Sequence, residues 1–539
     1  MTDAWPLGGL LLTFLIASAT AFATRLLQER TQRAVETIHI VAIAVALLLA
    51  IMLISNALNG ERLFLMGGLL FVDALGGIFL GLIVVVGFLT GLYSIGYLRH
   101  NLDKREISAA RLSTYYAFFH LFLFTMTLAV TANNLVLMWV AIEATTLASV
   151  FLVGFYGRRT SLEAAWKYVV ICTVGVAFGL YGTVLIFSNA NALLANAEDA
   201  ILWTEVVKHA GSLDPATIQL AFVFVLIGFG TKAGVFPMHT WMPDAYSEAP
   251  SPASALLTAG LANCALLIVI RLAVIATGTI GPAFPQTLFL LFGILSIGVA
   301  APLIFVQRDL KRMLAYSSVE NMGLIFLALG IGGPLGISAA LLHAINHGLV
   351  KTLLFCGSGN VLMKYGTRNL DAVKGILRVA PVSGFLLMAG ALALSGAPPF
   401  NMFISEFMTV VAGVKAGYVW LTLVCLLLLT VVFASFVRFI DGSVLGPAPA
   451  NLSKGDLGGL TLAPLGLALA LVLLMGLHVP RPVAQLVADA TGLINGVAAN
   501  AVGTTVSSAW RTIEVVAAPR GGAVLRCVSI REEDTTCPK

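Results

Sequence analysis

Charged side chains are scarce in this sequence of 539 residues: Asp, Glu, Lys and Arg make up 11% of it, against 59% hydrophobic residues. A soluble domain carries about 25% charged residues, so this scarcity excludes an ordinary water-soluble fold. The net charge of +5 does not indicate nucleic-acid binding, because Lys and Arg are scattered over short segments and form no stripe. The mean hydropathy of +0.96 indicates a chain that uses lipid as part of its solvent.

Motifs for redox cofactors and metals are also missing. No pair of cysteines has the CxxC spacing of a zinc or iron–sulfur site, and no GxGxxG opens a strand–helix unit for a nicotinamide or flavin. The six cysteines are Cys172, Cys264, Cys356, Cys425, Cys527 and Cys537. We therefore expect no cofactor in this chain and no flavin, iron–sulfur or haem absorbance from the purified protein.

Long apolar runs dominate what is present. Residues 7–23 lack a basic region in front of them, so they are expected to form a first membrane span and not a cleaved signal peptide. A span needs about 20 apolar residues. About fourteen candidates are centred near residues 15, 46, 83, 122, 144, 175, 227, 264, 295, 322, 350, 393, 428 and 468. The sequence predicts an all-α polytopic membrane protein.

The distribution of basic residues predicts the orientation. Arg and Lys gather in alternate loops, for example residues 99–111 and 308–312, while the intervening loops hold few of them. Basic loops face the cytoplasm, so both termini are expected outside, in a multi-pass protein of the cell inner (plasma) membrane. Residues 481–539 are more polar and are expected to form a mobile tail. If that tail lies outside, Cys527 and Cys537 could form a disulfide.

Four ionisable residues lie inside otherwise apolar spans: Glu143, Lys232, Lys351 and Glu406. A charge at mid-bilayer costs about 2.5–3.5 kcal/mol, so such residues are expected to face the protein interior. Two are acids and two are bases, which favours pairing in a hydrated core. The alternative is that these residues are structural ion pairs that only hold helices together.

His343, His347 and Lys351 follow at intervals of four residues and form one stripe on a helix. Histidine titrates near physiological pH, and a buried lysine shifts its pKa readily, so the stripe suits a proton relay. A metal site is the alternative. It would need a carboxylate or thiolate beside the two histidines, and no carboxylate lies in this span.

Two of the charged spans are interrupted. Lys232 is followed by Pro237 and Pro243, and Glu406 is preceded by Gly396, Pro398 and Pro399. At membrane depth, a broken helix is tolerated where it is buried in protein or lines a hydrated cavity. Paired broken helices that each carry a charge predict inverted repeats with sites near the midplane.

Four segments resemble the antiporter-like subunits of respiratory complex I and its relatives: TKAGVFPMHTWMPDAYSEAPSPASALL, KRMLAYSSVENMG, HAINHGLVKTLLF and SGAPPFNMFISEF. The stretch IEATTLASVFLVGFYGRRTSLEAAWKYVVICTVGVAFGLYGT is most similar to the component F type of hydrogenase-4 complexes. The resemblance implies two inverted five-helix repeats. The expected divisions are residues 1–110 (helices 1–3), 111–280 (helices 4–8), 281–442 (helices 9–13), 443–480 (the last span) and 481–539 (a polar tail).

The resemblance also implies roles along a proton pathway. Glu143 matches an acid of the fifth helix, Lys232 the lysine that pairs with it, and Glu406 the acidic form of an exit residue. His343, His347 and Lys351 match the central axis, and Lys167 resembles a second lysine near the first pair. The sequence departs from many relatives at Asn263, which stands where they carry lysine, so the relay would bridge Lys232 to Lys351 through water, His239 or the two histidines.

The resemblance implies a proton-translocating membrane subunit of a hydrogenase-4-type or NADH:quinone oxidoreductase complex, with no redox centre of its own. Iron–sulfur, nickel–iron or flavin groups are expected in partner subunits, membrane and peripheral. Two alternatives keep the same fold: a subunit of a multi-subunit Na⁺/H⁺ antiporter, and a membrane partner of an inorganic-carbon uptake system. The sequence does not distinguish H⁺ from Na⁺ or name the electron donor.

Overall fold

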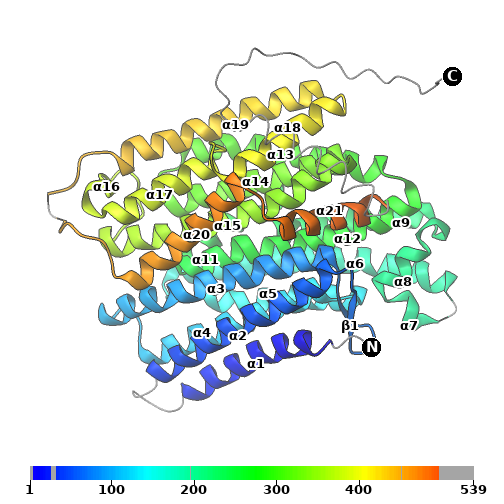
Figure 1. Ribbon diagram of the computed structural model, residues 1–539, viewed down its shortest axis with the longest axis horizontal. Helices are drawn as coiled ribbons and strands as arrows, with labels where there is room; N and C mark the ends of the chain where they lie inside the picture. Colours follow the sequence, from blue (N-terminus) through cyan, green and yellow to red (C-terminus); the bar gives the residue numbers. More distant parts are fainter. Residues whose placement is uncertain (1–3, 26–31, 195, 451, 497–539) are drawn as a thin grey trace, which may run out of the picture.

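A computed structural model describes residues 4–25, 32–194, 196–450 and 452–496, and Figure 1 shows its helices side by side in one broad array. In this part of the chain, thirteen helices are long and apolar enough to cross a membrane. A further span is split into α17 and α18. Each predicted centre falls in a span or in one of its halves, which confirms the all-α polytopic fold.

The first six spans are α1 (Trp5–Thr24), α2 (Gln32–Leu58), α3 (Ala74–Asp103), α4 (Ala109–Thr131), α5 (Leu135–Val153) and α6 (Arg159–Leu193). The next two comprise α9 (Pro215–Ala233) with α10 (Met242–Glu248), then α11 (Ser251–Leu256), a π-helical turn (Leu257–Leu261) and α12 (Ala262–Ile280). The remaining spans are α13 (Ala283–Val306), α14 (Leu310–Ile331), α15 (Gly333–Tyr365), α17 (Pro381–Leu394) with α18 (Asn401–Lys415), α19 (Val419–Phe439) and α20 (Gly459–Leu477).

Short elements lie between and after the spans. Strands β1 (Leu63–Leu65) and β2 (Leu70–Val72) form an antiparallel hairpin before α3. The short helices are α7 (Ala197–Ala200), α8 (Trp203–Lys208), a 3-10 turn (Ala210–Ser212), α16 (Ile376–Val379), a π-helical turn (Ile440–Val444) and α21 (Arg481–Asn495).

Both predicted helix breaks are present. Helix α9 ends at Gly234, whose φ of +82° is left-handed, and helix resumes only at Met242. Helix α17 ends before Gly396, whose φ is +72°, and α18 begins at Asn401 after Pro398 and Pro399. Glycine adopts the left-handed conformation without strain, and proline cannot donate to the preceding turn, so each break follows from its local sequence.

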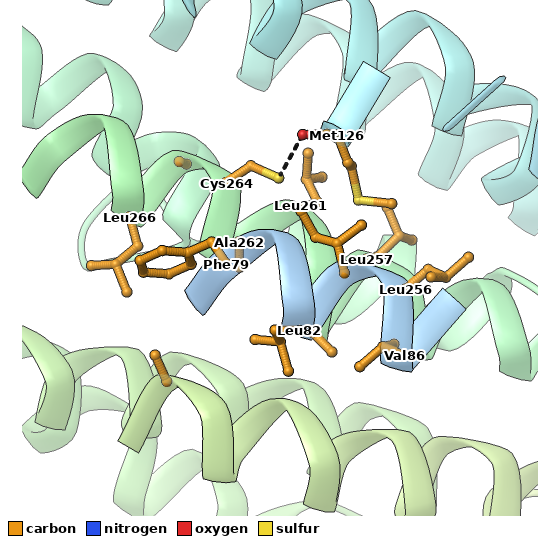
Figure 2. Close-up of a cluster of buried hydrophobic side chains, with 14 of the residues drawn as sticks. Phe79, Leu82, Val86, Met126, Leu256, Leu257, Leu261, Ala262, Cys264 and Leu266 are labelled. Atoms are coloured by element: carbon orange, nitrogen blue, oxygen red, sulfur yellow. Dashed lines mark hydrogen bonds between the residues drawn. The ribbon is translucent and has the colours of Figure 1, made fainter. Parts of the chain in front are cut away.

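Helices α12, α14 and α15 are almost entirely buried, whereas α1, α2, α13 and α19 expose most of their apolar surface. Exposed Leu, Val and Phe on those outer helices are the surface expected against lipid. Figure 2 shows one tight inner contact, in which α3 passes beside the π-helical turn, the start of α12 and Met126 of α4, with Leu82 on its opposite side. Gly260 allows this approach, because a Cβ there would lie 2.6 Å from the Met126 sulfur.

The expectation of a mobile tail from residue 481 is wrong for residues 481–495. These residues form α21, which packs against α3 and α15 and buries Leu486, Val487 and Ala490. The apolar residues of α21 recur at helical spacing among polar ones, a pattern that predicts an amphipathic helix. Cys527 and Cys537 lie outside the described residues.

Candidate functional site

Lys232 is fully buried near the end of α9, directly before the first helix break. Its ammonium donates to the Thr146 hydroxyl at 2.5 Å and to the Tyr168 hydroxyl at 3.1 Å. The ammonium also lies 4.7 Å from the centre of the Tyr168 ring, a cation–π contact. Neutral hydroxyls from α5 and α6 thus hold this buried cation.

Glu143 lies on α5, three residues before Thr146. Its Oε1 accepts a hydrogen bond from Thr173 at 2.8 Å, and its buried Oε2 has no hydrogen-bond partner among the described residues. Glu143 and Lys232 therefore form no direct ion pair among the described residues, and the pairing that the resemblance implies stays a prediction. Thr146, one helical turn after Glu143, is the residue of α5 that contacts the ammonium.

Lys167 lies apart from this buried group. Its side chain is 36% exposed and pairs with Glu163 at 2.6 Å and Asp244 at 3.4 Å. Asp244 of α10 also pairs with Arg312 of α14 at 2.6 Å. Lys167 therefore belongs to an ion-pair network at the protein surface, and sequence reasoning did not identify Asp244 as its shared partner.

His239 and Asn263 lie between the two halves of the predicted pathway. His239 is buried in the break between α9 and α10, and Asn263 is buried just after the π-helical turn of the eighth span. Asn263 donates to the Ala259 carbonyl at 2.8 Å. His239 Nδ1 and Asn263 Oδ1 have no hydrogen-bond partner among the residues described. A buried polar atom is costly inside a membrane span unless it is hydrogen-bonded, so both residues are candidates for a functional polar site.

Lys351 of α15 is fully buried and is held by α14. Its ammonium donates to the Leu314 carbonyl at 2.8 Å and to the Ser317 hydroxyl. Glu320 follows Ser317 by one helical turn and is 2% exposed. Sequence reasoning missed Glu320. This acid lies inside the span segment LAYSSVENMGLIFLALG, so it is an ionisable residue within a span, like Glu143, Lys232, Lys351 and Glu406.

A continuous hydrogen-bonded line leads from Glu320 to α18. Asn321 Nδ2 donates to Glu320 at 2.5 Å, and Asn321 Oδ1 lies 3.0 Å from His343 Nε2. His343 Nδ1 lies 2.9 Å from the Ser405 hydroxyl. Asn321 Nδ2 also donates to the Ser317 carbonyl at 2.6 Å, which identifies it as the amide nitrogen. The other amide atom, Oδ1, can only accept a hydrogen bond, so His343 Nε2 carries the proton between them.

His347, the middle residue of the predicted stripe, is also fully buried. Neither of its ring nitrogens has a hydrogen-bond partner in the described ranges. The helix therefore places His343, His347 and Lys351 in one buried layer, as predicted, but only the outer two contact polar groups. Within the residues that the structure describes, no group of three or more His, Cys, Asp or Glu side chains is placed to hold a metal ion.

Glu406 follows Ser405 on α18 and is half-buried. Its carboxylate lies against Gly396 at the helix break, where a Cβ would overlap it. The break therefore needs glycine there, both for the carboxylate and for the left-handed backbone. Lys351 does not reach Glu406 in this structure, because its hydrogen bonds are to α14.

Further polar pairs involve the first four spans and α12, and sequence reasoning did not use them. Asp73 and Arg271 form a two-pronged ion pair at 2.8 and 3.1 Å. Glu36 and Arg99 pair at 2.6 Å. His39 Nδ1 lies 2.9 Å from His120 Nε2. Each arrangement joins two different helices or a helix and the residue before one, and a sequence pattern along one helix cannot reveal such a contact.

The chain resembles known membrane proteins over most of its length. It is 39% identical over 342 residues to the hydrogenase-4 component F homolog of Methylacidiphilum infernorum (isolate V4), covering 64% of this chain and 72% of that protein. It is 33% identical over 392 residues to NADH-quinone oxidoreductase subunit N of Desulforudis audaxviator (strain MP104C), covering 72% of this chain and 75% of that subunit.

Among solved structures, the fold is similar to a chain of the membrane-bound sulfane sulfur reductase, an archaeal respiratory membrane complex. The TM-score is 0.81 at 23% identity, over 93% of this chain and 99% of that one. At this identity the likeness concerns the fold alone.

The family described as "NADH:quinone oxidoreductase/Mrp antiporter, TM" matches residues 132–433, more than half of the sequence. That range includes both broken spans and the candidate site residues from Glu143 to Glu406. The chain therefore belongs to the NADH:quinone oxidoreductase/Mrp antiporter transmembrane family.

Proposed function

We propose that this chain is the proton-translocating, antiporter-like membrane subunit of a hydrogenase-4-type or NADH:quinone oxidoreductase-like complex. The 39% identity to a hydrogenase-4 component F homolog supports the hydrogenase-4-type complex. The main support is the buried polar line that runs from Lys351 to Ser317, from there to Asn321 with Glu320 beside it, and on through His343 to Ser405 next to Glu406. Such groups are costly inside a membrane, which makes them functional candidates by default.

The proposed pathway has two halves. In the first half, Glu143 and Lys232 exchange charge across Thr146. In the second half, Lys351 and Glu320 exchange a proton with Glu406, with His343 as the titratable group between them and Asn321, an amide that carries no proton itself, fixing the orientation of the His343 ring. Water beside His239, Asn263 and His347 would connect the halves, because each of these residues has an unpartnered buried polar atom. Lys167 lies in the surface ion-pair network, so it would affect the pathway only through the electrostatic field of its charge.

Inverted repeats over residues 111–280 and 281–442 remain part of this proposal. Each range contains one broken span with an ionisable residue beside the break, and this supports the repeats. Residues 1–110 and 443–480 would supply the flanking spans. The predicted orientation, with both termini outside an inner (plasma) membrane, also belongs to the proposal.

Partners would carry out the electron transfer. The matched hydrogenase-4 and NADH-quinone oxidoreductase names indicate complexes with redox chemistry, so iron–sulfur, nickel–iron or flavin groups are proposed in other subunits. A Na⁺/H⁺ antiporter complex is the second candidate, and the family name, which includes the Mrp antiporters, favours it. Neighbouring genes for redox subunits or for small antiporter subunits would separate the two.

The deciding experiment reconstitutes the whole complex in vesicles and measures protons moved per redox turnover. Lys351→Met should abolish proton movement, because it removes the buried cation beside Ser317. Lys415→Met is a matched control, since Lys415 is an exposed lysine at the end of α18. Normal proton movement by Lys351→Met would contradict the pathway, and transport driven by Na⁺ without redox turnover would favour the antiporter branch.

A further inference from the structure

A polar cavity of about 630 Å³ opens between the helix ends that the predicted cytoplasmic loops connect. Its walls come from the end of α3, the start of α6, the end of α10, the start of α14 and the end of α15. Five basic side chains line it, against two acidic ones. The basic residues are Lys104, Arg158, Lys311, Lys364 and Arg368, and the acids are Glu106 and Glu248.

The two acids are already paired. Glu106 lies 3.8 Å from Arg158, and Glu248 forms a close ion pair with Arg368. Burial alone would raise the pKa of Glu248, but the hydrogen bond and charge of Arg368 hold it below its ordinary value. Glu248 is therefore anionic, and its charge is matched by Arg368. Neither acid is free to neutralise the remaining lysines.

Three ammonium groups remain without a carboxylate partner in the described part of the chain: those of Lys104, Lys311 and Lys364. Lys311 is the informative one, because it is 1% exposed and lines the cavity. It donates one hydrogen bond, to the Ala249 carbonyl at 2.5 Å. A lysine ammonium has three donors, and an anion beside it stabilises the charged form against the cost of burial. The Lys311 ammonium therefore has donors without a partner among the described residues, on the buried wall of the cavity.

We infer that this cavity binds a phosphate group, carried by an anionic lipid or free in solution. Several oxygens of one phosphate can accept from ammonium groups on different walls, and lysine binds phosphate as a point charge. Basic pockets between membrane helices on the cytoplasmic side suit lipid headgroups. Leu362 and Met363 supply apolar lining beside the charges. This site shares no residue with the proposed proton pathway.

The test uses the purified complex in neutral-lipid nanodiscs, with inorganic phosphate and phosphatidylglycerol as separate probes. Calorimetry follows phosphate binding, and native mass spectrometry follows retained lipid. Lys311→Met should weaken binding about tenfold or more, since it removes a buried charged donor. Lys364→Gln should weaken it about two- to fivefold as a rim charge. Lys454→Gln is the control, because Lys454 is exposed and lies outside the cavity lining.

Each outcome has a definite meaning. Phosphatidylglycerol binding that phosphate does not displace identifies a lipid site, and displacement by phosphate or phosphate binding alone identifies an ion site. The proposal fails if neither probe binds the wild-type complex, including when an acidic side chain of another subunit fills the cavity. It also fails if Lys311→Met and Lys364→Gln bind like the wild type. Proton pumping, measured in parallel, reports separately on the proposed function.

Discussion

The ammonium of Lys232 lies 2.5 Å from the hydroxyl of Thr146, one helical turn beyond Glu143 on α5. The lysine is therefore buried without a carboxylate as its direct partner. Exchanging the hydroxyl for the carboxylate would need a movement of about 4.5 Å along α5, or a change in the Lys232 side chain. Two such arrangements differ strongly in how well they hold a proton on the lysine, because an anion nearby favours the charged form.

Glu143→Gln and Lys232→Ala should each abolish coupled pumping while the protein still inserts. The first removes the only charge that can reach the lysine from α5, and the second removes the proton carrier. Proton uptake by vesicles that contain the whole complex measures the effect. Glu205→Gln is the control, because Glu205 is a partly exposed acid that pairs with the exposed Lys208. Wild-type rates in both pathway variants would disprove the assignment.

Glu320→Gln should lower the pumping rate at least about tenfold, which corresponds to a barrier about 1.4 kcal/mol higher. The amide keeps the size of the side chain and can still accept from Asn321, but it cannot carry a negative charge between Lys351 and Glu406. The measurement is protons per turnover at several driving forces. If the Gln variant pumps normally, Glu320 has only a packing role.

Glu406→Gln should block proton translocation, and Glu406→Asp should retain part of it. The carboxylate lies at the break where backbone groups are freed and water has access, so a titratable group is needed there. A carboxylate that only caps the broken helix would be replaced well by Gln through hydrogen bonding. Near-normal pumping by the Gln variant in proteoliposomes would therefore show a structural role.

Asp73→Asn should destabilise the protein by about 3–5 kcal/mol, because it leaves Arg271 buried without its anion. Asp371→Asn is the control, since its ion pair with Arg308 is largely exposed. Thermal unfolding in detergent measures both. An Asp73→Asn variant as stable as the control would show that Arg271 finds another partner.

The same ion pair predicts a dependence on pH. Burial would raise the pKa of Asp73, but the charge and hydrogen bonds of Arg271, with the Gly76 amide, hold it below its ordinary value. A lowered pKa in the folded state means that the stabilisation is complete above the unfolded pKa of about 3.9. It is lost as the pH falls through the lower folded value. Unfolding midpoints measured in acid should therefore drop more for the wild type than for Asp73→Asn.

The tautomers of the buried His39–His120 pair follow from their partners. His39 Nε2 lies 3.0 Å from the Gly91 carbonyl, which only accepts, so this nitrogen carries the proton. In the neutral pair, His39 Nδ1 then accepts from His120 Nε2–H, and His120 Nδ1 is left without a proton. Nitrogen-15 NMR of histidine-labelled protein should show this pattern, with a coupling across the N–H···N bond.

Gly91→Ala should remove that coupling, because a Cβ at position 91 would lie 3.1 Å from His39 Nε2. Gly466→Ala is the matched control, since its Cβ would meet no atom within 4 Å. A coupling that survives in Gly91→Ala would show that the His39 ring accommodates the added methyl group without losing its bond to His120.

The membrane fold, the approximate positions of the spans, both helix breaks and the location of Glu143, Lys232, Lys351 and Glu406 inside apolar segments could all be predicted from the sequence. These features depend on local composition: apolar length sets a span, and proline and glycine set a break. The partners of each charge depended on tertiary structure. Lys232 contacts Thr146 and Tyr168, Lys167 joins Asp244, and α21 docks on α3 because side chains from distant helices meet only after packing. A hydrogen bond depends on positions in space, and a one-dimensional pattern fixes such positions only along a single helix.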